Sequence, residues 1–198
     1  GGASNMDTVM IYWGRATDID TTAPTKLHGL LPQDGFGASL CIGNLIGDST
    51  ADLVIGSPQY PPSPVIQGRM YIYRGGASFD TIPALVLNGD SARYTLGVAC
   101  AIGDLNNDGH NDLAARGWFQ FGTSSQRFDY VNVWFGGTAF DTTRDMQLRS
   151  GFILSTGLSV FDANSDGIVD LLWTSRDSLL NDWVYIHFGG ISISTIPS

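Results

Sequence analysis

The segment GDLNNDGHNDL, residues 103–113, carries oxygen-bearing side chains at regular spacing around a glycine. With Asp104 as position 1, Asn106 and Asp108 stand at positions 3 and 5, and Asp112 stands at position 9. The glycine follows the third of these residues, where a tight turn favours a residue without a β-carbon. The spacing is compatible with a solvated turn rich in Asp and Asn. It is also the spacing of a loop that wraps a hard cation.

The segment FDANSDGIVDL, residues 161–171, repeats these donors and the glycine at the same positions, which favours the cation-binding interpretation. Oxygen donors on an adaptable loop suit Ca²⁺ better than Zn²⁺, which prefers Cys and His. An EF-hand is excluded, because position 12 is not Glu and the flanking segments predict strands. We therefore expect two Ca²⁺ sites, with the residue at position 7 contributing its main-chain carbonyl. The expected ligands are Asp104, Asn106, Asp108, His110 (main chain) and Asp112, then Asp162, Asn164, Asp166, Ile168 (main chain) and Asp170.

A third, degenerate copy begins at Asn44 and keeps Asp48 and Asp52 at positions 5 and 9. Position 3 is Ile46, which has no oxygen donor, and position 6 is Ser49 in place of glycine. We expect this third site to be empty or weak.

Four strand-like segments outside these loops also repeat. Each alternates bulky residues with a period of two and ends at a glycine, which is typical of a strand that runs into a turn. They are DTVMIYWG (7–14), GRMYIYRG (68–75), DYVNVWFG (129–136) and DWVYIHFG (182–189). Between them lie three blocks that align with one another, residues 36–58, 96–118 and 154–176.

The repeat unit therefore reads strand, acidic loop, strand, variable loop, strand, turn, strand. We predict an all-β fold made of β-propeller blades, each with four antiparallel strands. The chain would form one partial propeller. Its expected parts are the outer strands of an incomplete blade (1–35), two blades (36–94 and 95–153) and a blade whose last strand is truncated (154–198).

Composition narrows the classes of partner. The formal net charge is −9, and all nineteen acidic residues are Asp, a residue that favours turns and cation loops. One Lys and nine Arg are too few for a nucleic-acid-binding surface, so no nucleic-acid partner is expected. No apolar run approaches the roughly 20 residues of a membrane-spanning helix.

The segments FGASL, GDLNNDGHNDL, ADLVIGSP and GRMYIYRGG resemble FG-GAP repeats, the units of the integrin α-subunit β-propeller. The resemblance implies that each Ca²⁺ loop joins the innermost strand of a blade to its second strand. It also implies that the loops between second and third strands lie on the opposite face. Family propellers typically have seven blades, so a longer chain or self-association is expected to supply the rest.

The chain departs from the family pattern in its later repeats. The Phe-Gly pair at Phe36 becomes Leu96-Gly97 and then Leu154-Ser155. The Gly-Ala-Pro element is Gly56-Ser57-Pro58 in the first repeat, and it is unrecognisable in the others, where we align it with Ala115-Arg116-Gly117 and Thr174-Ser175-Arg176.

The innermost strands have one bulky and one small face. Cys100 falls on the bulky face of its strand and Cys41 on the small face of another, so we expect two buried free thiols that do not pair. The three His are dispersed and form no catalytic constellation. The chain is therefore expected not to be an enzyme.

The variable loops 57–67, 115–128 and 174–182 are where a partner is expected to bind. Their aromatic and Arg residues are typical of binding surfaces, although Trp118 and Phe119 could equally continue a strand into the core. The candidates are Tyr60, Trp118, Phe119, Phe121, Arg127 and Arg176. We expect an extracellular or cell-surface, Ca²⁺-binding recognition or adhesion module with a protein or glycan ligand. The alternatives are a lectin-like carbohydrate-binding propeller and an accessory domain of a larger secreted enzyme.

Overall fold

The structure is a computed structural model, and it describes residues 6–63, 65–120, 127–149, 157–177, 179 and 181–191. These residues form thirteen β-strands and no helix. It follows that the described part of the chain contains no helix suited to crossing a membrane. The strands are β1 (Thr8–Ile11), β2 (Thr25–His28), β3 (Ser39–Gly43), β4 (Asp52–Ser57), β5 (Arg69–Tyr73), β6 (Leu85–Asn88), β7 (Ala99–Gly103), β8 (Asp112–Gln120), β9 (Arg127–Trp134), β10 (Met146–Arg149), β11 (Leu158–Phe161), β12 (Asp170–Arg176) and β13 (Asp182–His187).

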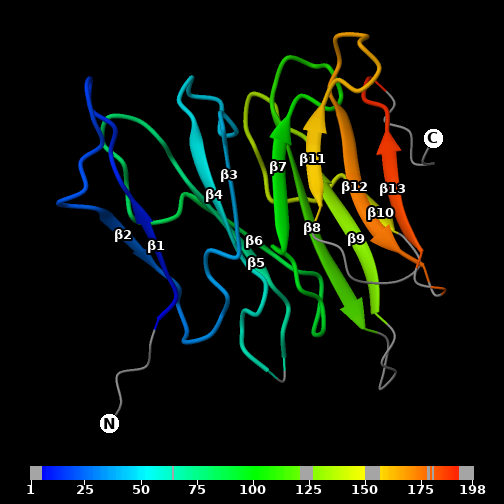
Figure 1. Cartoon of the computed structure of the whole chain (residues 1–198), viewed down its shortest axis with the longest axis horizontal. Coiled ribbons are helices and arrows are strands. Elements are labelled where there is room, and N and C mark those ends of the chain that lie inside the picture. Colours follow the sequence, from blue (N-terminus) through cyan, green and yellow to red (C-terminus); the bar gives the residue numbers. More distant parts are fainter. Residues whose placement is uncertain are drawn as a thin grey trace.

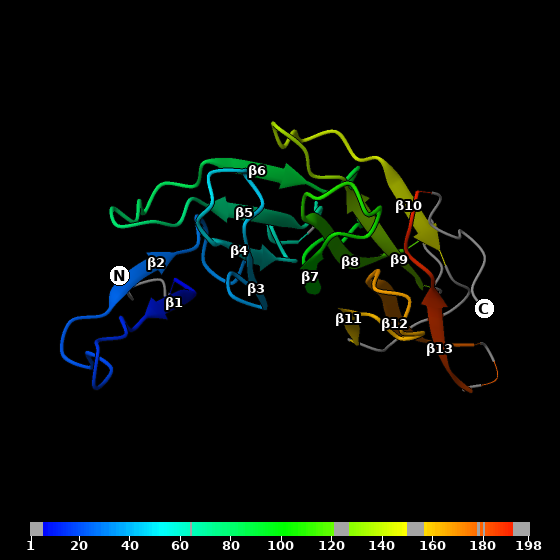
Figure 2. The same cartoon turned by 90° about the horizontal axis from the view of Figure 1, so that it is seen from above.

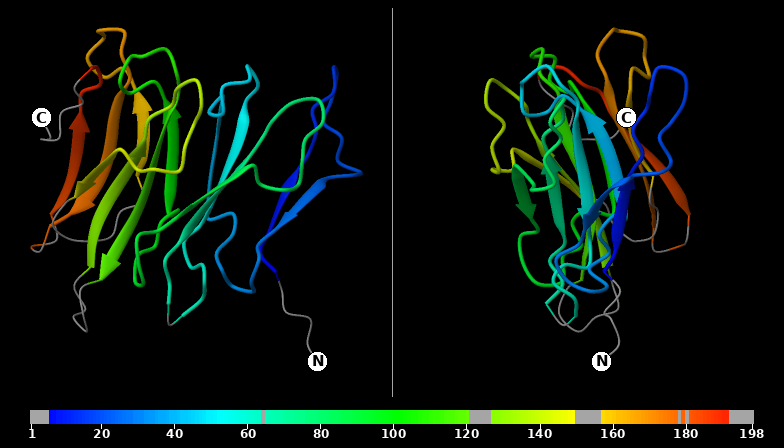
Figure 3. Two further views of the ribbon diagram at one scale, coloured as in Figure 1. Left: turned by 180° about the vertical axis from the view of Figure 1, so that it is seen from behind. Right: turned by 90° about the vertical axis from the view of Figure 1, so that its left-hand side faces the viewer.

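The strands form four antiparallel sheets, and each sheet consists of strands that are consecutive in the sequence. Sheet 1 is β1-β2, sheet 2 is β3-β4-β5-β6, sheet 3 is β7-β8-β9-β10, and sheet 4 is β11-β12-β13. The sheets follow one another along the molecule in chain order (Figures 1 and 3). Seen from above, the innermost strands β3, β7 and β11 lie on one side of the row, and the outer strands β6 and β10 lie on the other (Figure 2). The predicted all-β architecture of blade-like sheets is confirmed, whereas the residues assigned as blade boundaries stay a prediction.

Neighbouring sheets pack bulky side chains against small residues. Ile102 of β7 packs over Gly43 of β3, where an added β-carbon would lie 2.6 Å from Ile102 Cγ2. In the same way Val160 of β11 packs over Gly103 of β7, with a corresponding separation of 3.1 Å. The bulky faces of β7 and β11 therefore each meet the small face of the preceding innermost strand. This rule explains the two kinds of face seen in the sequence.

Three apolar clusters fill the spaces between the sheets. The largest lies between sheets 2 and 3 and contains the fully buried Met70 and Tyr130. Another, around Trp173, joins sheets 3 and 4, and a third, around Tyr71, joins sheets 1 and 2. Because the sheets share no hydrogen-bonded ladder, these side chains carry most of the contact between blades.

Two of the predicted variable loops are shorter than expected. Strand β8 continues to Gln120 and β9 begins at Arg127, so most of the predicted loop 115–128 is strand. Strand β12 likewise continues to Arg176. Eight β8-β9 residue pairs and stacked aromatic rings extend the first of these hairpins beyond the length that alignment suggested.

The alignment of the Gly-Ala-Pro element in the second repeat was wrong by one residue. Gly56 pairs with Ser39 in sheet 2, and Arg116 pairs with Ala99 at the equivalent place in sheet 3. The equivalent segment is therefore Arg116-Gly117-Trp118. Leu154 and Ser155 lie outside the described residues.

Candidate metal centre

The three acidic loops occupy equivalent places in sheets 2, 3 and 4. In Figure 1, β7 and β11 run upward into their loops, and β8 and β12 return downward from them. The last pair of each hairpin joins the position-9 Asp to the residue before position 1. These pairs are Gly43 with Asp52, Gly103 with Asp112, and Phe161 with Asp170.

In the loop of sheet 3, the side chains at positions 1, 3 and 5 converge on one set of backbone amides. The amide of Asp108 donates to Asp104 Oδ1 and to Asn106 Oδ1, both at 3.0 Å. The amide of Gly109 donates to Asp104 Oδ2 at 2.8 Å. The amide of His110 donates to Asp108 Oδ1 at 2.8 Å, so the bonds together hold two carboxylates and one amide oxygen within a single turn. Two residues in left-handed conformation, Asn107 (φ 60°) and Gly109 (φ 87°), make that turn possible.

The loop of sheet 4 repeats this network. The amide of Asp166 donates to Asp162 Oδ1 at 3.1 Å and to Asn164 Oδ1 at 3.0 Å, and the amide of Gly167 donates to Asp162 Oδ2 at 2.9 Å. Ser165 (φ 64°) and Gly167 (φ 87°) again adopt the left-handed conformation. Two segments 58 residues apart in the sequence thus place the same donors in the same arrangement.

The Asp at position 9 has a different environment. Asp112 is fully buried, and it accepts hydrogen bonds from the amides of Leu105 at 2.8 Å and Gly136 at 2.7 Å. Burial raises the pKa of Asp112 to about 6, against the lowering effect of these amides. Asp52 and Asp170 make the equivalent bonds, to the amides of Gly75 and Gly189 among others. The position-9 carboxylate therefore braces each loop against the end of the third strand.

The glycines that end the third strands are explained by this brace. A β-carbon on Gly136 would lie 2.1 Å from the carbonyl oxygen of Asn111, directly before Asp112. Gly75 and Gly189 approach the equivalent carbonyls, of Ala51 and Val169, as closely. A β-carbon added to Gly14, which follows β1, would meet no atom within 4 Å, and the described residues of sheet 1 include no equivalent acidic loop.

The degenerate loop of sheet 2 is neutralised by a side chain. Arg74 Nη1 lies 2.9 Å from Asp48 Oδ2, at the carboxylate that stands at position 5. The hydroxyl and amide of Thr50 lower the pKa of Asp48, and Arg74 lowers it further. The equivalents of Arg74 in the third and fourth sheets are Phe135 and Phe188, so the cation is specific to the loop that lacks a full donor set. Ser49 at position 6 still has a φ of 69°.

The donor set of the other two loops fits a hard cation in its chemistry. Within the described ranges, no three Asp, Glu, His or Cys side chains gather as a metal-binding cluster. Each of the two loops instead combines two Asp carboxylates with one Asn oxygen, while the third Asp faces backbone amides. Oxygen-only donors on a flexible turn are those that Ca²⁺ takes.

The candidate partner-binding residues fall into two groups. The guanidinium of Arg69 lies 3.7 Å from the ring centre of Tyr60, and that of Arg127 lies 4.2 Å from Trp118. These pairs are half-buried, at the edge opposite the acidic loops. Arg176 is at that edge too and is paired with Asp182 at 2.7 Å.

Phe119 does not belong to this surface. It is only 7% exposed and stacks between Tyr94 and Phe128, with ring centres 5.2 and 5.3 Å away. Its inclusion among the ligand-binding candidates is corrected, because the longer β8 carries it into the core. Phe121 lies outside the described residues.

A buried ion pair was missed by sequence reasoning. Arg116, 1% exposed, lies 2.7 Å from Asp129, which also accepts a hydrogen bond from the hydroxyl of Ser175 at 2.9 Å. Both residues of the pair belong to sheet 3. The hydroxyl of Ser175 and the ring of Trp173, 5.9 Å from the guanidinium of Arg116, connect the pair to sheet 4. The sequence did contain one sign of this pair, because Arg116 stands where the first repeat has Gly56.

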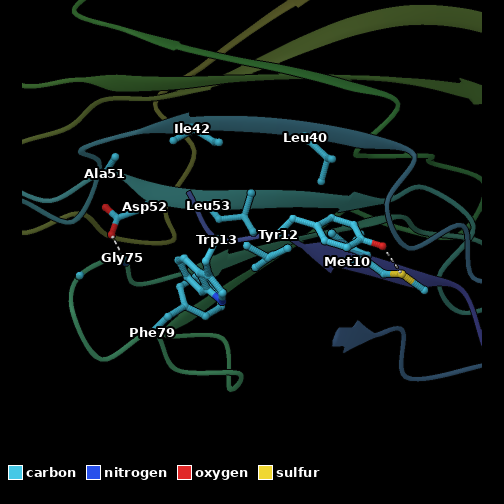
Figure 4. Close-up of a pocket in the computed structure, with 13 residues that line it drawn as sticks. Met10, Tyr12, Trp13, Leu40, Ile42, Ala51, Asp52, Leu53, Gly75 and Phe79 are labelled. Atoms are coloured by element: carbon cyan, nitrogen blue, oxygen red, sulfur yellow. Dashed lines mark hydrogen bonds between the residues drawn. The ribbon is translucent and has the colours of Figure 1, made fainter. Parts of the chain in front are cut away.

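An apolar hollow of about 380 Å³ lies between β1 and the innermost strand of sheet 2. Met10, Tyr12, Leu40 and Ile42 line it, and Trp13 and Phe79 lie together at one end (Figure 4). Leu40 and Ile42 belong to the bulky face of β3, which in the other sheets meets a small face; here Ile42 is 69% exposed. Within the described residues, the hollow lies where the other sheets have a contact between a bulky face and a small face.

Cys41 and Cys100 are free thiols, as expected, although they are less deeply buried than predicted and lie near each other. Both are half-buried and pack against the same apolar cluster between sheets 2 and 3. Their assignment to different faces of different blades was right. Those two faces are the ones that meet.

Comparison with known proteins gives the family. No family model matches the chain. It is 36% identical to integrin alpha-3 of Mus musculus over 89 residues, which are 43% of this chain and 8% of that protein. It is 29% identical to integrin alpha-3 of Cricetulus griseus over 150 residues, 73% of this chain and 14% of that protein. It is 32% identical to integrin alpha-6 of Gallus gallus over 141 residues, 69% of this chain and 12% of that protein.

The chain thus spans less than a sixth of the length of these relatives. Their matches and the blade-like antiparallel sheets agree with the repeat motifs read from the sequence. Over the matched residues, the chain is an FG-GAP region of the integrin α-subunit type.

Proposed function

We propose that this chain is a Ca²⁺-binding, non-catalytic recognition or adhesion module that works outside the cytoplasm. The observation that carries the proposal is the duplicated oxygen-donor network at Asp104 and Asp162, formed at the same strand junction in two sheets. Similarity to integrin α subunits supports the adhesive role. The expected ligands remain Asp104, Asn106, Asp108, His110 (main chain) and Asp112, then Asp162, Asn164, Asp166, Ile168 (main chain) and Asp170.

The cation would neutralise two carboxylates that otherwise face each other within one turn. Loops of this kind in extracellular modules bind Ca²⁺ with dissociation constants on the order of 0.1–1 mM. Such sites fill at extracellular Ca²⁺ concentrations and stay empty in the cytosol. In the first loop the guanidinium of Arg74 already supplies a positive charge, so that loop needs no metal.

Calcium titration of chelator-treated protein, followed by calorimetry, tests the proposal. Two sites per chain are expected, and Asp108→Ala and Asp166→Ala should each remove one. Asp48→Ala is the matched control, because it changes the same position in the loop that Arg74 neutralises; it should leave both sites intact. Absence of binding to the folded wild type would contradict the proposal. Equal loss in Asp48→Ala would contradict the assignment of the loops.

The partner is proposed to be a protein that binds the edge opposite the acidic loops. Two Arg–aromatic pairs, Arg69 with Tyr60 and Arg127 with Trp118, stand there on neighbouring sheets. Half-buried aromatic rings under guanidinium groups are typical of protein-binding surfaces. Screening extracellular proteins in millimolar Ca²⁺ should give a ligand whose binding is lost in Trp118→Ala. A positive glycan array with no protein ligand would instead favour the lectin-like alternative.

A further inference from the structure

Cys41 and Cys100 occupy facing positions on innermost strands of neighbouring sheets. Cys41 lies in β3 on the small face of sheet 2, and Cys100 lies in β7 on the bulky face of sheet 3. The two strands are in contact, and the thiol of Cys100 is near enough to that of Cys41 to raise its pKa. Both are half-buried against the same apolar cluster.

Contacts on both sides of the thiols fix the register of the two strands. Before them in the chain, the hydroxyl of Ser39 donates to the carbonyl of Gly97 at 2.8 Å. After them, Ile102 packs over Gly43. The two strands therefore run side by side in the same direction with the thiols between two close contacts. The register of the two strands is thus fixed by contacts that involve neither sulfur atom.

We propose that Cys41 and Cys100 form a disulfide bond that joins sheet 2 to sheet 3 when the protein folds under oxidising conditions. The bond would link two blades whose contact otherwise consists mostly of side-chain packing. Such bonds form and persist outside the cytoplasm. The inference goes beyond the proposed function, and it does not depend on whether the acidic loops bind Ca²⁺.

The reaction needs a two-electron oxidant, for which a small disulfide such as oxidised glutathione serves. One protein thiolate attacks a glutathione sulfur, forming a mixed disulfide and releasing one glutathione thiolate. The second protein thiolate then attacks the protein sulfur of the mixed disulfide and releases the other glutathione. The two protein thiols are oxidised, the glutathione disulfide is reduced, and the two thiol protons end on the two glutathione molecules.

The neighbouring thiol and burial raise the pKa of Cys41, so little thiolate is present in the folded protein near neutral pH. Oxidation should therefore be slow once the protein has folded and faster during folding. The bond would restrict the unfolded chain between residues 41 and 100, which raises the thermal midpoint by roughly 10 °C in the chain-entropy account.

The test is to refold the full chain from denaturant with a mixture of reduced and oxidised glutathione. Free thiols are then counted, and peptides are mapped without reduction. The expected result is monomer with no free thiol, a mass lower by two hydrogen atoms, and one linked peptide pair containing Cys41 and Cys100. Dithiothreitol should lower the thermal midpoint of this wild-type protein. The double variant Cys41→Ala/Cys100→Ala should show no midpoint shift with dithiothreitol.

Two free thiols in folded, oxidatively treated protein would overturn the proposal, as would separate glutathione adducts on both cysteines or linkage between chains. If the double variant fails to fold, wild type with and without dithiothreitol still decides the question, because both samples have the same sequence. Calcium stoichiometry is measured on the same oxidised and reduced samples. Protein that binds two Ca²⁺ but forms no disulfide would contradict this inference alone. Protein that forms the disulfide but binds no Ca²⁺ would contradict the proposed function alone.

Discussion

Gly136→Ala should destabilise the protein strongly, although it adds one methyl group at the surface end of a strand. The added β-carbon would lie 2.1 Å from the carbonyl oxygen and 2.9 Å from the carbonyl carbon of Asn111. Both atoms belong to the backbone that holds Asp112, so no flexible side chain can move aside. The segment that carries residue 136 must shift instead, and its amide then leaves the buried carboxylate of Asp112, to which it donates at 2.7 Å.

The two effects add to a measurable loss. Overpacking of this kind costs about 1–3 kcal/mol. Weakening a hydrogen bond to a buried charged group costs about 1.5–3 kcal/mol. We therefore expect the free energy of unfolding to fall by about 3–5 kcal/mol, which corresponds to a thermal midpoint lower by roughly 10 °C. Urea unfolding in the presence of a chelator measures the change without a contribution from bound metal.

Gly137→Ala is the control, at the adjacent residue. A β-carbon added there would meet no atom within 4 Å, and the φ of Gly137 is outside the left-handed region. This variant should be neutral, or more stable by about 0.4–1 kcal/mol because the unfolded chain loses freedom. If both variants changed stability equally, the close approach of Gly136 to Asn111 would not be the reason for the glycine.

Asp129→Asn should lower the free energy of unfolding by about 3–5 kcal/mol, since it leaves the buried guanidinium of Arg116 without its charged partner. Replacing the pair together, as Arg116→Met with Asp129→Leu, should cost less; a larger loss on urea unfolding would contradict this account. Ser49→Gly alone should stabilise the protein by roughly 1 kcal/mol by removing a non-glycine residue from a φ of 69°, and thermal unfolding measures the change. Adding Asn44→Asp, Ile46→Asn and Arg74→Phe to that variant should create a further Ca²⁺ site, counted by calorimetry; an unchanged stoichiometry would show that donor set and charge are not what disables the first loop.

Much of the fold could be predicted from the sequence, because aligning the repeats shows which positions recur and therefore where strands and loops lie. Period-two alternation ending at a glycine placed the third strands, and Asp104 and its equivalents placed the loops between first and second strands. The extension of β8 to Gln120 could not be predicted in this way. It depends on stacking of Phe119 with Tyr94 and Phe128, which lie in a different segment and strand and are not part of the repeat pattern.

The residues of the acidic loops could be predicted from the sequence, but the groups that surround each of them could not. Spacing identified Asp112 as a donor, but only the structure shows that its two oxygens face the amides of Leu105 and Gly136. Arg74 was visible as an Arg where the other repeats have Phe, yet its role follows only from its closeness to Asp48. Likewise, the faces of Cys41 and Cys100 were assigned correctly, but the sequence does not state which faces of neighbouring sheets meet.

The bulky-to-small contact between sheets also has a consequence for how such a chain lengthens. Strands β7 and β11 present large side chains toward the preceding unit, where small residues meet them, as Ile102 on Gly43 and Val160 on Gly103 show. An in-frame tandem duplication of one unit therefore brings matching surfaces on both sides, without any compensating substitution in its neighbours. Adding blades by gene duplication therefore creates no steric clash between neighbouring units. An inverted copy would instead place large residues against large ones.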